Sequence, residues 1–153
     1  MLSSAVGSCL DVCGVDLSSV LGGLARERGG ALCSQARFVA GDHYHRELVH
    51  HAPGLEVWLL SWLPGQVSPI HDHGGVITVT TVLSGRLFEE RFERTGCGRL
   101  VRPSWSNTRV AGEIDPIDPS EIHRVTPVVP TVTLHLYAPG CADGAVYETA
   151  LAS

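Results

Sequence analysis

The clearest helical pattern in the chain lies near the N-terminus, over residues 11–29. Apolar residues recur there at spacings of three and four, which is the period of a helix with one apolar face. These positions are Leu17, Val20, Leu21 and Leu24. Asp16 or Ser18 can cap the start of the helix with a side-chain oxygen, and the pair Gly29-Gly30 is expected to end it. The pattern therefore predicts one short N-terminal helical segment.

After residue 30 the chain consists of short runs of Val, Thr, Leu and Trp broken by Gly, Pro, Asp and Asn, which is typical of strands joined by turns. The runs predicted as strands are 36–40, 44–50, 55–63, 66–72, 76–83, 86–93, 98–102, 108–112, 121–126 and 131–138. Ser84-Gly85 stands between two long runs and predicts a tight hairpin. The predicted fold class is mainly all-β. It is a single domain over 1–153, with the helix ahead of a barrel or of two paired sheets over residues 36–140.

Two histidines in the strand run 66–72 and just beyond it indicate metal chemistry. Residues i and i+2 of a strand point to the same face, so His71 and His73 face one way while Asp72 faces the other. Two imidazoles placed in this way can reach one metal ion. A third ligand has to come from another segment, and His123, after a loop rich in Pro and Asp, is the best candidate. A lone pair of this kind is weak evidence, because two surface or core histidines give the same pattern.

The strand run 131–138 alternates strictly between apolar and polar residues. Thr133, His135 and Tyr137 share one face, and alternation alone would allow that face to point to solvent. Because all three side chains can pass on hydrogen bonds, and because the run follows the His123 segment, we expect them to point inward instead. Tyr137 would then present its phenol near the metal, oriented through His135 and Thr133.

Composition and charge narrow the function classes. The net charge is −5, and the eleven basic residues are all Arg and are scattered, which argues against nucleic-acid binding. No apolar run is long enough to span a membrane, and the first residues lack the pattern of a secretory signal, so we expect a cytoplasmic protein. The five cysteines are odd in number and irregularly spaced, which does not suggest a disulfide framework. Exposed strand edges would allow a monomer or a homodimer.

The spacing around the histidines resembles the first motif of the cupin β-barrels, also called jelly rolls. Gly65, His71, His73 and Gly85 stand at the motif positions, while Thr78 stands where cupins usually place a metal-binding Glu. The second cupin motif is looser, since His123 is present with Pro119 before it, but Glu121 replaces the usual Gly. The resemblance implies a site with three neutral histidine ligands that leaves metal positions open for other groups.

Within the cupins the chain resembles the cysteine dioxygenase family of thiol dioxygenases over roughly residues 38–140. The segments that carry the resemblance are Tyr44-His-Arg46-Glu-Leu-Val, Leu60-Ser-Trp62, Pro69-Ile-His71-Asp-His73, Ile122-His123-Arg124-Val125 and Leu134-His135-Leu136-Tyr137. The resemblance implies Fe(II) held by His71, His73 and His123, a small thiol such as L-cysteine as substrate, and O₂ as co-substrate. Both oxygen atoms would be added to the sulfur, giving a sulfinic acid.

The resemblance also implies the roles of other residues. Tyr137 and His135 belong to a catalytic relay, with Thr133 where the family commonly has Ser. Arg46 stands where cysteine-using members bind the substrate carboxylate, a role that suits a guanidinium, and Tyr44 and Thr78 are further substrate-binding candidates. Animal members join the equivalent of Tyr137 to a Cys at the position of Thr78, so we expect no such crosslink here.

Three questions stay open at this stage. Three imidazoles bind Ni(II), Cu(II) and Zn(II) as well as or better than iron, so the pattern does not fix the metal. The segment Gly74–Thr80 differs from the usual family run, which allows a biosynthetic enzyme that oxidises cysteine past the sulfinate. A different metal cupin enzyme and a non-catalytic cupin that binds a small molecule are the remaining alternatives.

Overall fold

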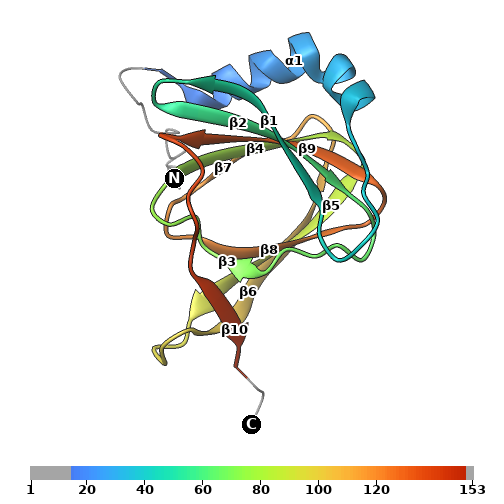
Figure 1. Ribbon diagram of the computed structural model, residues 1–153. Coiled ribbons are helices and arrows are strands. Elements are labelled where there is room, and N and C mark those ends of the chain that lie inside the picture. Colours follow the sequence, from blue (N-terminus) through green and yellow to red (C-terminus); the bar gives the residue numbers. More distant parts are fainter. Residues whose placement is uncertain (1–14, 151–153) are drawn as a thin grey trace, which may run out of the picture.

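The computed structural model describes residues 15–150, which form one helix, α1 (Leu17–Gln35), and ten strands. The strands are β1 (His45–Ala52), β2 (Leu55–Trp62), β3 (Ile70–His71), β4 (Ile77–Ser84), β5 (Arg86–Arg94), β6 (Leu100–Val110), β7 (Ile114–Ile117), β8 (Ile122–Pro127), β9 (Thr131–Ala138) and β10 (Val146–Thr149). Two sheets face each other, and α1 lies along the outer face of one of them (Figure 1). The expected mainly-β jelly-roll barrel with an N-terminal helix is confirmed.

The two sheets differ in how they end. The sheet under α1 has the order β1-β2-β9-β4-β7. The other sheet has the order β10-β3-β8-β5-β6 and closes on itself, because β10 pairs antiparallel with β3 and parallel with β6. Closure of this kind leaves no free edge on β3, the short strand that carries His71.

Helix α1 is capped by Asp16, one of the two expected residues, begins at Leu17 within the predicted run, and ends later than expected. The Asp16 carboxylate accepts a hydrogen bond from the Ser18 backbone N–H at 3.1 Å and caps the first turn. The helix then runs through Gly29 and Gly30 to Gln35, because Leu32 beyond them is fully buried against the sheet. The predicted start at residues 11–14 lies outside the described residues.

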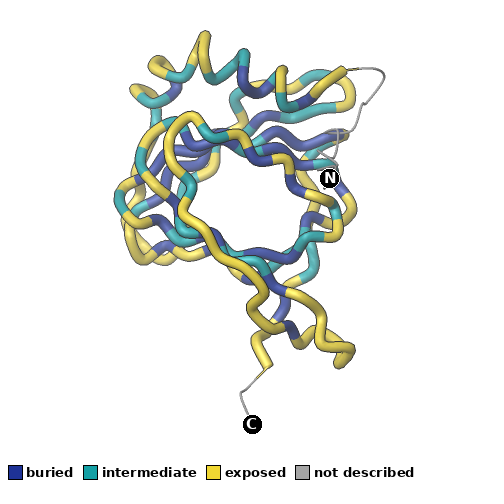
Figure 2. Tube along the Cα trace, turned by 180° about the vertical axis from the view of Figure 1, so that it is seen from behind, coloured by how far each residue is buried: buried dark blue, intermediate teal, exposed yellow. Residues whose placement is uncertain are grey.

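Alternation along the strands separates two apolar layers. One face of the helix-covered sheet packs against α1. The other side of α1 is exposed to solvent (Figure 2). The strand residues of this layer are Val57, Leu59, Val79, Val132, Leu134 and Leu136. The opposite face points between the two sheets, where Leu60, Trp62 and Val82 pack against Leu87 and Val125. The site described below lies in this inner layer.

Several predicted strand bounds are wrong, for identifiable reasons. Residues 36–40 form no strand. The carbonyl oxygens of Val39 and of Gly41, just after this run, instead accept hydrogen bonds from the Gln66 side chain at 2.7 and 3.0 Å. The predicted strand 66–72 shrinks to Ile70–His71. The two strands predicted at 98–102 and 108–112 overlap the two ends of one long strand, β6. Strands β7 and β10 were not predicted.

Ser84-Gly85 does not form the predicted hairpin. Strand β4 pairs with β7 and β9, whereas β5 pairs with β6 and β8, so the chain crosses from one sheet to the other at this point. Gly85 has a φ of +91°, and a Cβ there would stand 2.6 Å from the Pro130 carbonyl oxygen. The glycine is therefore required for the sheet-to-sheet crossing rather than for a hairpin turn.

Two further findings concern the state of the cysteines and the character of helix α1. Within residues 15–150 the cysteines Cys33, Cys97 and Cys141 are all free thiols. In the same part of the chain α1 is not an apolar segment of the kind that crosses a bilayer.

Candidate metal centre and its cavity

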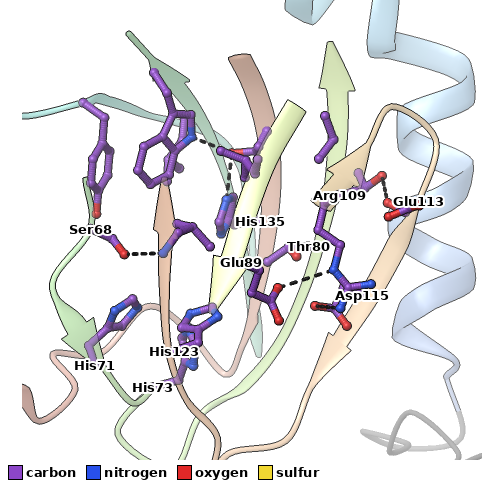
Figure 3. Close-up of a pocket in the computed structure, with 18 of the residues that line it drawn as sticks. Ser68, His71, His73, Thr80, Glu89, Arg109, Glu113, Asp115, His123 and His135 are labelled. Atoms are coloured by element: carbon purple, nitrogen blue, oxygen red, sulfur yellow. Dashed lines mark hydrogen bonds and ion pairs between the residues drawn. The ribbon is translucent and has the colours of Figure 1, made fainter. Parts of the chain in front are cut away.

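The three predicted metal ligands meet in the inner layer of the barrel. His71 on β3 pairs directly with His123 on β8, and His73 follows two residues later. Their ring centroids are 4.8–5.0 Å apart, and the ring nitrogens that could bind an ion lie within 4.8 Å of one another. The sequence prediction that these three histidines come together is therefore met by the structure (Figure 3).

Asp72, between two of these histidines, points away from them as predicted and fixes their segment. Its carboxylate accepts hydrogen bonds from the Gly74 N–H at 3.0 Å, the Ala145 N–H at 2.8 Å and the Tyr147 hydroxyl at 2.8 Å. Two of these donors lie at or next to β10, so the C-terminal strand holds the short β3 segment in place. A Cβ on Gly144 would overlap the Asp72 carbonyl oxygen, so Gly144 permits this close approach.

The electrostatics of the three rings suit a metal. Burial lowers the pKa of His71, and it lowers the pKa of His73 to about 4, with His71 adding to the effect. Burial, followed by the other two rings, also lowers the pKa of His123. All three are therefore neutral imidazoles at pH 7, which is the form that binds metals.

The hydrogen bonds of the rings leave nitrogens for an ion. Nδ1 of His71 lies 2.8 Å from the Pro69 carbonyl oxygen, which leaves Nε2 of that ring free. Nδ1 of His73 and of His123 are buried without any hydrogen-bond partner among the described residues. Neutral nitrogen donors with unmet bonding capacity fit a divalent transition metal.

A chain of hydrogen bonds leads from the core to the cavity beside the histidines. The Trp62 indole N–H donates to the Thr133 hydroxyl at 3.0 Å, and Thr133 Oγ1 lies 2.8 Å from His135 Nε2. His135 Nδ1 lies 3.4 Å from the Tyr137 hydroxyl. Thr133, His135 and Tyr137 thus face inward, as expected from their hydrogen-bonding chemistry and their place after the His123 segment.

The first hydrogen bond of this chain has a fixed direction. Indole can only donate, so the Thr133 hydroxyl accepts from Trp62, and its own proton is available for His135 Nε2. Burial lowers the pKa of His135 to about 3, so this ring is neutral and carries one proton. If Thr133 donates to Nε2, that proton is on Nδ1 and faces Tyr137. Burial also raises the pKa of Tyr137, which keeps its phenol protonated. The Tyr137 proton is then free to be donated into the cavity.

The mouth of the site contains two of the predicted substrate-binding residues, Tyr44 and Arg46. Tyr44 stacks on Trp62 with ring centroids 3.9 Å apart. Arg46 lines an outer pocket of about 330 Å³ together with Tyr44, His71, His73 and Tyr137. The structure therefore brings Arg46 and Tyr44 to the same opening as the histidines.

Thr78 is placed differently from Arg46 and Tyr44. It lies directly opposite Tyr137 in the β4–β9 pairing, at the position where a cysteine could reach the phenol. Its side chain is fully buried, its hydroxyl lies 3.4 Å from the Val76 carbonyl oxygen, and it does not line the cavity or the outer pocket.

A charged inner wall was missed by the sequence analysis. An inner cavity of about 50 Å³ extends from the histidines toward Glu89, Arg109 and Asp115 (Figure 3). Arg109 lies 3.1 Å from Asp115 and 3.5 Å from Glu89, and Arg91 lies 2.7 Å from Glu89 and 3.3 Å from both Asp115 and Glu121. Burial, then the nearby Glu89 carboxylate, raises the pKa of Asp115 to about 7 although the arginines offset part of this.

The pattern of residues 86–93 explains why this wall was missed. Phe88 and Phe92 are separated by three charged residues and would be assigned to the interior by hydrophobicity. In the structure Phe92 is buried in a separate cluster that includes Tyr147 of β10, and Glu89 faces the cavity. The one available signal was the count of charged residues in this run, which is high for a strand of a small barrel.

These features define a class of protein: a two-sheet cupin barrel with a three-histidine site for a single metal ion. The family model described as cysteine dioxygenase type I matches residues 33–150. The chain belongs to this cysteine dioxygenase family of cupin proteins, and the three histidines and the inward strand β9 are those that the sequence resemblance had implied.

Solved structures agree on the fold. A double-stranded β-helix protein from Klebsiella pneumoniae superposes with a TM-score of 0.60 at 22% identity, over 76% of this chain and 88% of that one. The protein TT1209 from Thermus thermophilus gives a TM-score of 0.57 at 21% identity, over 71% and 94% of the two chains. KdgF from Halomonas gives a TM-score of 0.53 at 18% identity, over 66% and 84%. At these identities the likeness concerns the fold alone.

Proposed function

We propose that this protein is an iron-dependent thiol dioxygenase that converts L-cysteine and O₂ to cysteine sulfinate. The observation that carries the proposal is the placement of Arg46 at the same opening as His71, His73 and Tyr137. Among residues 15–150 no carboxylate forms an ion pair with Arg46, so its charge is available to a substrate. A guanidinium of this kind selects a carboxylate through two parallel hydrogen bonds.

The metal site provides the part of the reaction that side chains cannot perform. Fe(II) held by His71, His73 and His123 would bind the substrate as a thiolate and bring O₂ next to it. In the balanced reaction the C–S bond stays intact, O₂ is reduced, and both of its atoms become bonded to the sulfur. The thiol proton is released.

The protein side chains position the reactants. Arg46 would hold the carboxylate at the mouth, so that the thiol end of a molecule as short as cysteine reaches the histidines. Tyr137 would donate its proton as a hydrogen bond to the oxygen that gains charge, with His135 Nδ1, 3.4 Å from the phenol oxygen, donating to that oxygen from behind. Tyr44 would form one side of the opening, and Thr78 would stabilise the wall beside Tyr137.

The test is the product mass from L-cysteine with the iron-loaded protein under labelled O₂. The proposal predicts cysteine sulfinate carrying two labelled oxygen atoms. A product that has lost carbon or nitrogen, or that carries further oxygens, would show instead a biosynthetic enzyme that takes the oxidation past the sulfinate. Unchanged cysteine would contradict the proposed substrate and leave a cupin that binds or oxidises another molecule.

A further inference from the structure

Arg46 is held in place without being neutralised. Its guanidinium carbon lies 4.9 Å from the centroid of the Trp58 ring, over the ring face. One of its terminal nitrogens donates a hydrogen bond to the Cys141 sulfur at 3.0 Å. A thiol sulfur is a weak acceptor and an aromatic face carries no net charge, so both contacts orient the guanidinium and leave its positive charge and its other N–H groups free.

Glu56 connects the two groups that touch Arg46. One of its carboxylate oxygens accepts hydrogen bonds from the Trp58 indole N–H and from the Cys141 backbone N–H, both at 3.0 Å. The backbone hydrogen bond to Cys141, and then that from Trp58, lower the pKa of Glu56, so it is a carboxylate at neutral pH. Glu56 thereby ties strand β2 to the segment that follows β9.

The residue before Cys141, Gly140, also lies close to Glu56. A Cβ on Gly140 would stand 3.3 Å from the Glu56 carboxylate, a distance that forces the neighbour to move. Glu56 and Trp58 also share the inward face of β2 with the cavity residues, since they pair with Tyr137 and His135 of β9. The assembly is therefore continuous with the site.

We propose that Glu56, Trp58 and Cys141 are positioning residues that hold Arg46 ready for the carboxylate of a thiol substrate. We call these three residues the Arg46 clamp. The inference rests on the proposed function in that it takes Arg46 to bind the substrate. It adds that selection for a carboxylate depends on the clamp placing only the Trp58 ring and the Cys141 sulfur, and no carboxylate oxygen, in direct contact with the guanidinium.

The experiment measures equilibrium binding of L-cysteine and of cysteamine to the iron-loaded protein without oxygen. Cysteamine has the same thiol and amine as cysteine and lacks only the carboxylate. Trp58→Leu removes the ring face, and we expect it to weaken L-cysteine binding about five- to tenfold and to leave cysteamine binding unchanged. Trp58→Phe keeps a ring face and should restore most of the affinity.

Cys141 allows a sharper pair of variants. Cys141→Ser keeps a neutral acceptor and should change L-cysteine binding less than about threefold. Cys141→Asp places a carboxylate on the guanidinium and should weaken L-cysteine binding more than about twentyfold, while cysteamine binding is unchanged or stronger. Glu56→Ala should behave like Trp58→Leu. Glu47→Gln, one residue from Arg46 on β1 and with a side chain that accepts a hydrogen bond from Gln35, is the matched control.

The outcomes separate this inference from the proposed function. Equal losses for L-cysteine and cysteamine in the clamp variants, or L-cysteine binding in Cys141→Asp that matches the unmodified protein, would overturn the clamp. Melting temperatures and iron content of each variant identify any that fail to fold. If the unmodified protein binds L-cysteine tighter than cysteamine but oxidises neither, the proposed function fails while the clamp is still tested by binding.

Discussion

The two ends of the cavity use the same residue type in opposite ways. At the mouth, Arg46 is in contact with a thiol sulfur and an aromatic ring. At the inner wall, Arg109 contacts the carboxylates of Glu89 and Asp115, and Arg91 contacts the same two and Glu121. The inner arginines form ion pairs with carboxylates of the protein itself. Arg46 forms none among residues 15–150, so its charge is available to a ligand.

The difference shows that the acceptors around an arginine, rather than its exposure, decide its role. Glu89 and Asp115 lie on β5 and β7, which belong to different sheets, so the inner ion pairs join the two halves of the barrel. An ion-pair network that is already satisfied serves structure, and removing one member leaves buried charge without compensation. An arginine that is oriented but unpaired serves recognition.

The largest effect is expected from removing a metal ligand at the point where the two ends meet. His123→Ala should lower bound iron to a small fraction of one per chain and reduce cysteine oxidation more than about a thousandfold, because two imidazoles hold the ion too weakly. Metal analysis and product formation on the same sample test this. A variant that keeps full metal content would mean that the ion is held elsewhere.

At the mouth, Arg46→Gln should raise the KM for L-cysteine about ten- to a hundredfold, because a charge-assisted pair with the carboxylate is lost. The KM for cysteamine should stay the same, since it has no carboxylate. Steady-state kinetics with the two thiols provide the measurement. A KM for L-cysteine that does not change would remove Arg46 from the binding site.

At the inner wall, Arg109→Gln should instead affect stability. It leaves Glu89 and Asp115 short of a partner, which we expect to cost about 2–4 kcal/mol of unfolding free energy, while the KM for L-cysteine changes less than twofold. Denaturant unfolding of the two arginine variants, side by side, tests whether their roles are separate. If Arg109→Gln raised the KM as much as Arg46→Gln, the comparison would be wrong.

A smaller effect is expected from the hydrogen-bond chain behind the cavity. Thr133→Val removes the hydroxyl that fixes the tautomer of His135, and kcat should fall about tenfold as the Tyr137 proton loses its direction. Thr133→Ser keeps the hydroxyl and should retain activity within about twofold. Comparison of kcat for both variants is decisive, and equal losses would indicate a packing effect rather than an effect on the relay.

The smallest effect concerns the pH dependence of the inner wall. The pKa of Asp115 is raised from its ordinary value of 3.8 to about 7 in the folded protein, so the folded state holds this proton more tightly than the unfolded chain. Any stability from Asp115 is thus present below about pH 4 and lost as the pH rises through 7.

Asp115→Asn cannot titrate, which makes it the matched reference. The unfolding free energy of the unmodified protein minus that of Asp115→Asn should fall by about 1 kcal/mol between pH 5 and pH 8, after allowance for screening. The buried histidines titrate in both proteins and cancel in the difference. A difference that rises with pH over this range would contradict the raised pKa.

The sequence predicted the parts of the site that follow from local spacing. The i, i+2 rule placed His71 and His73 on one face with Asp72 on the other, and alternation placed Thr133, His135 and Tyr137 on a common face. Their hydrogen-bonding chemistry and their place after the His123 segment indicated that this face points inward. His123 was chosen as third ligand from its segment, and the family resemblance supplied Arg46. Both lie at the site in the structure.

The parts that could not be predicted depend on contacts between distant segments. Glu89 faces the cavity because Arg91 on β5 and Arg109 on β6 compensate its charge there, and no local pattern in residues 86–93 shows this. The Arg46 clamp joins residues 56, 58 and 141, which are brought together only by the pairing of β2 with β9. Ser84-Gly85 had the composition of a hairpin, and only the sheet pairing shows that it crosses between sheets.

The central claim is that the two ends of the cavity are divided between substrate recognition and structure. A crystal structure of the iron-loaded protein with L-cysteine bound in the absence of oxygen tests it most directly. The account predicts the sulfur at the ion held by His71, His73 and His123, and the carboxylate on Arg46 at the mouth. A carboxylate bound at the inner wall against Arg109, with Arg46 still touching only Cys141 and Trp58, would contradict the account.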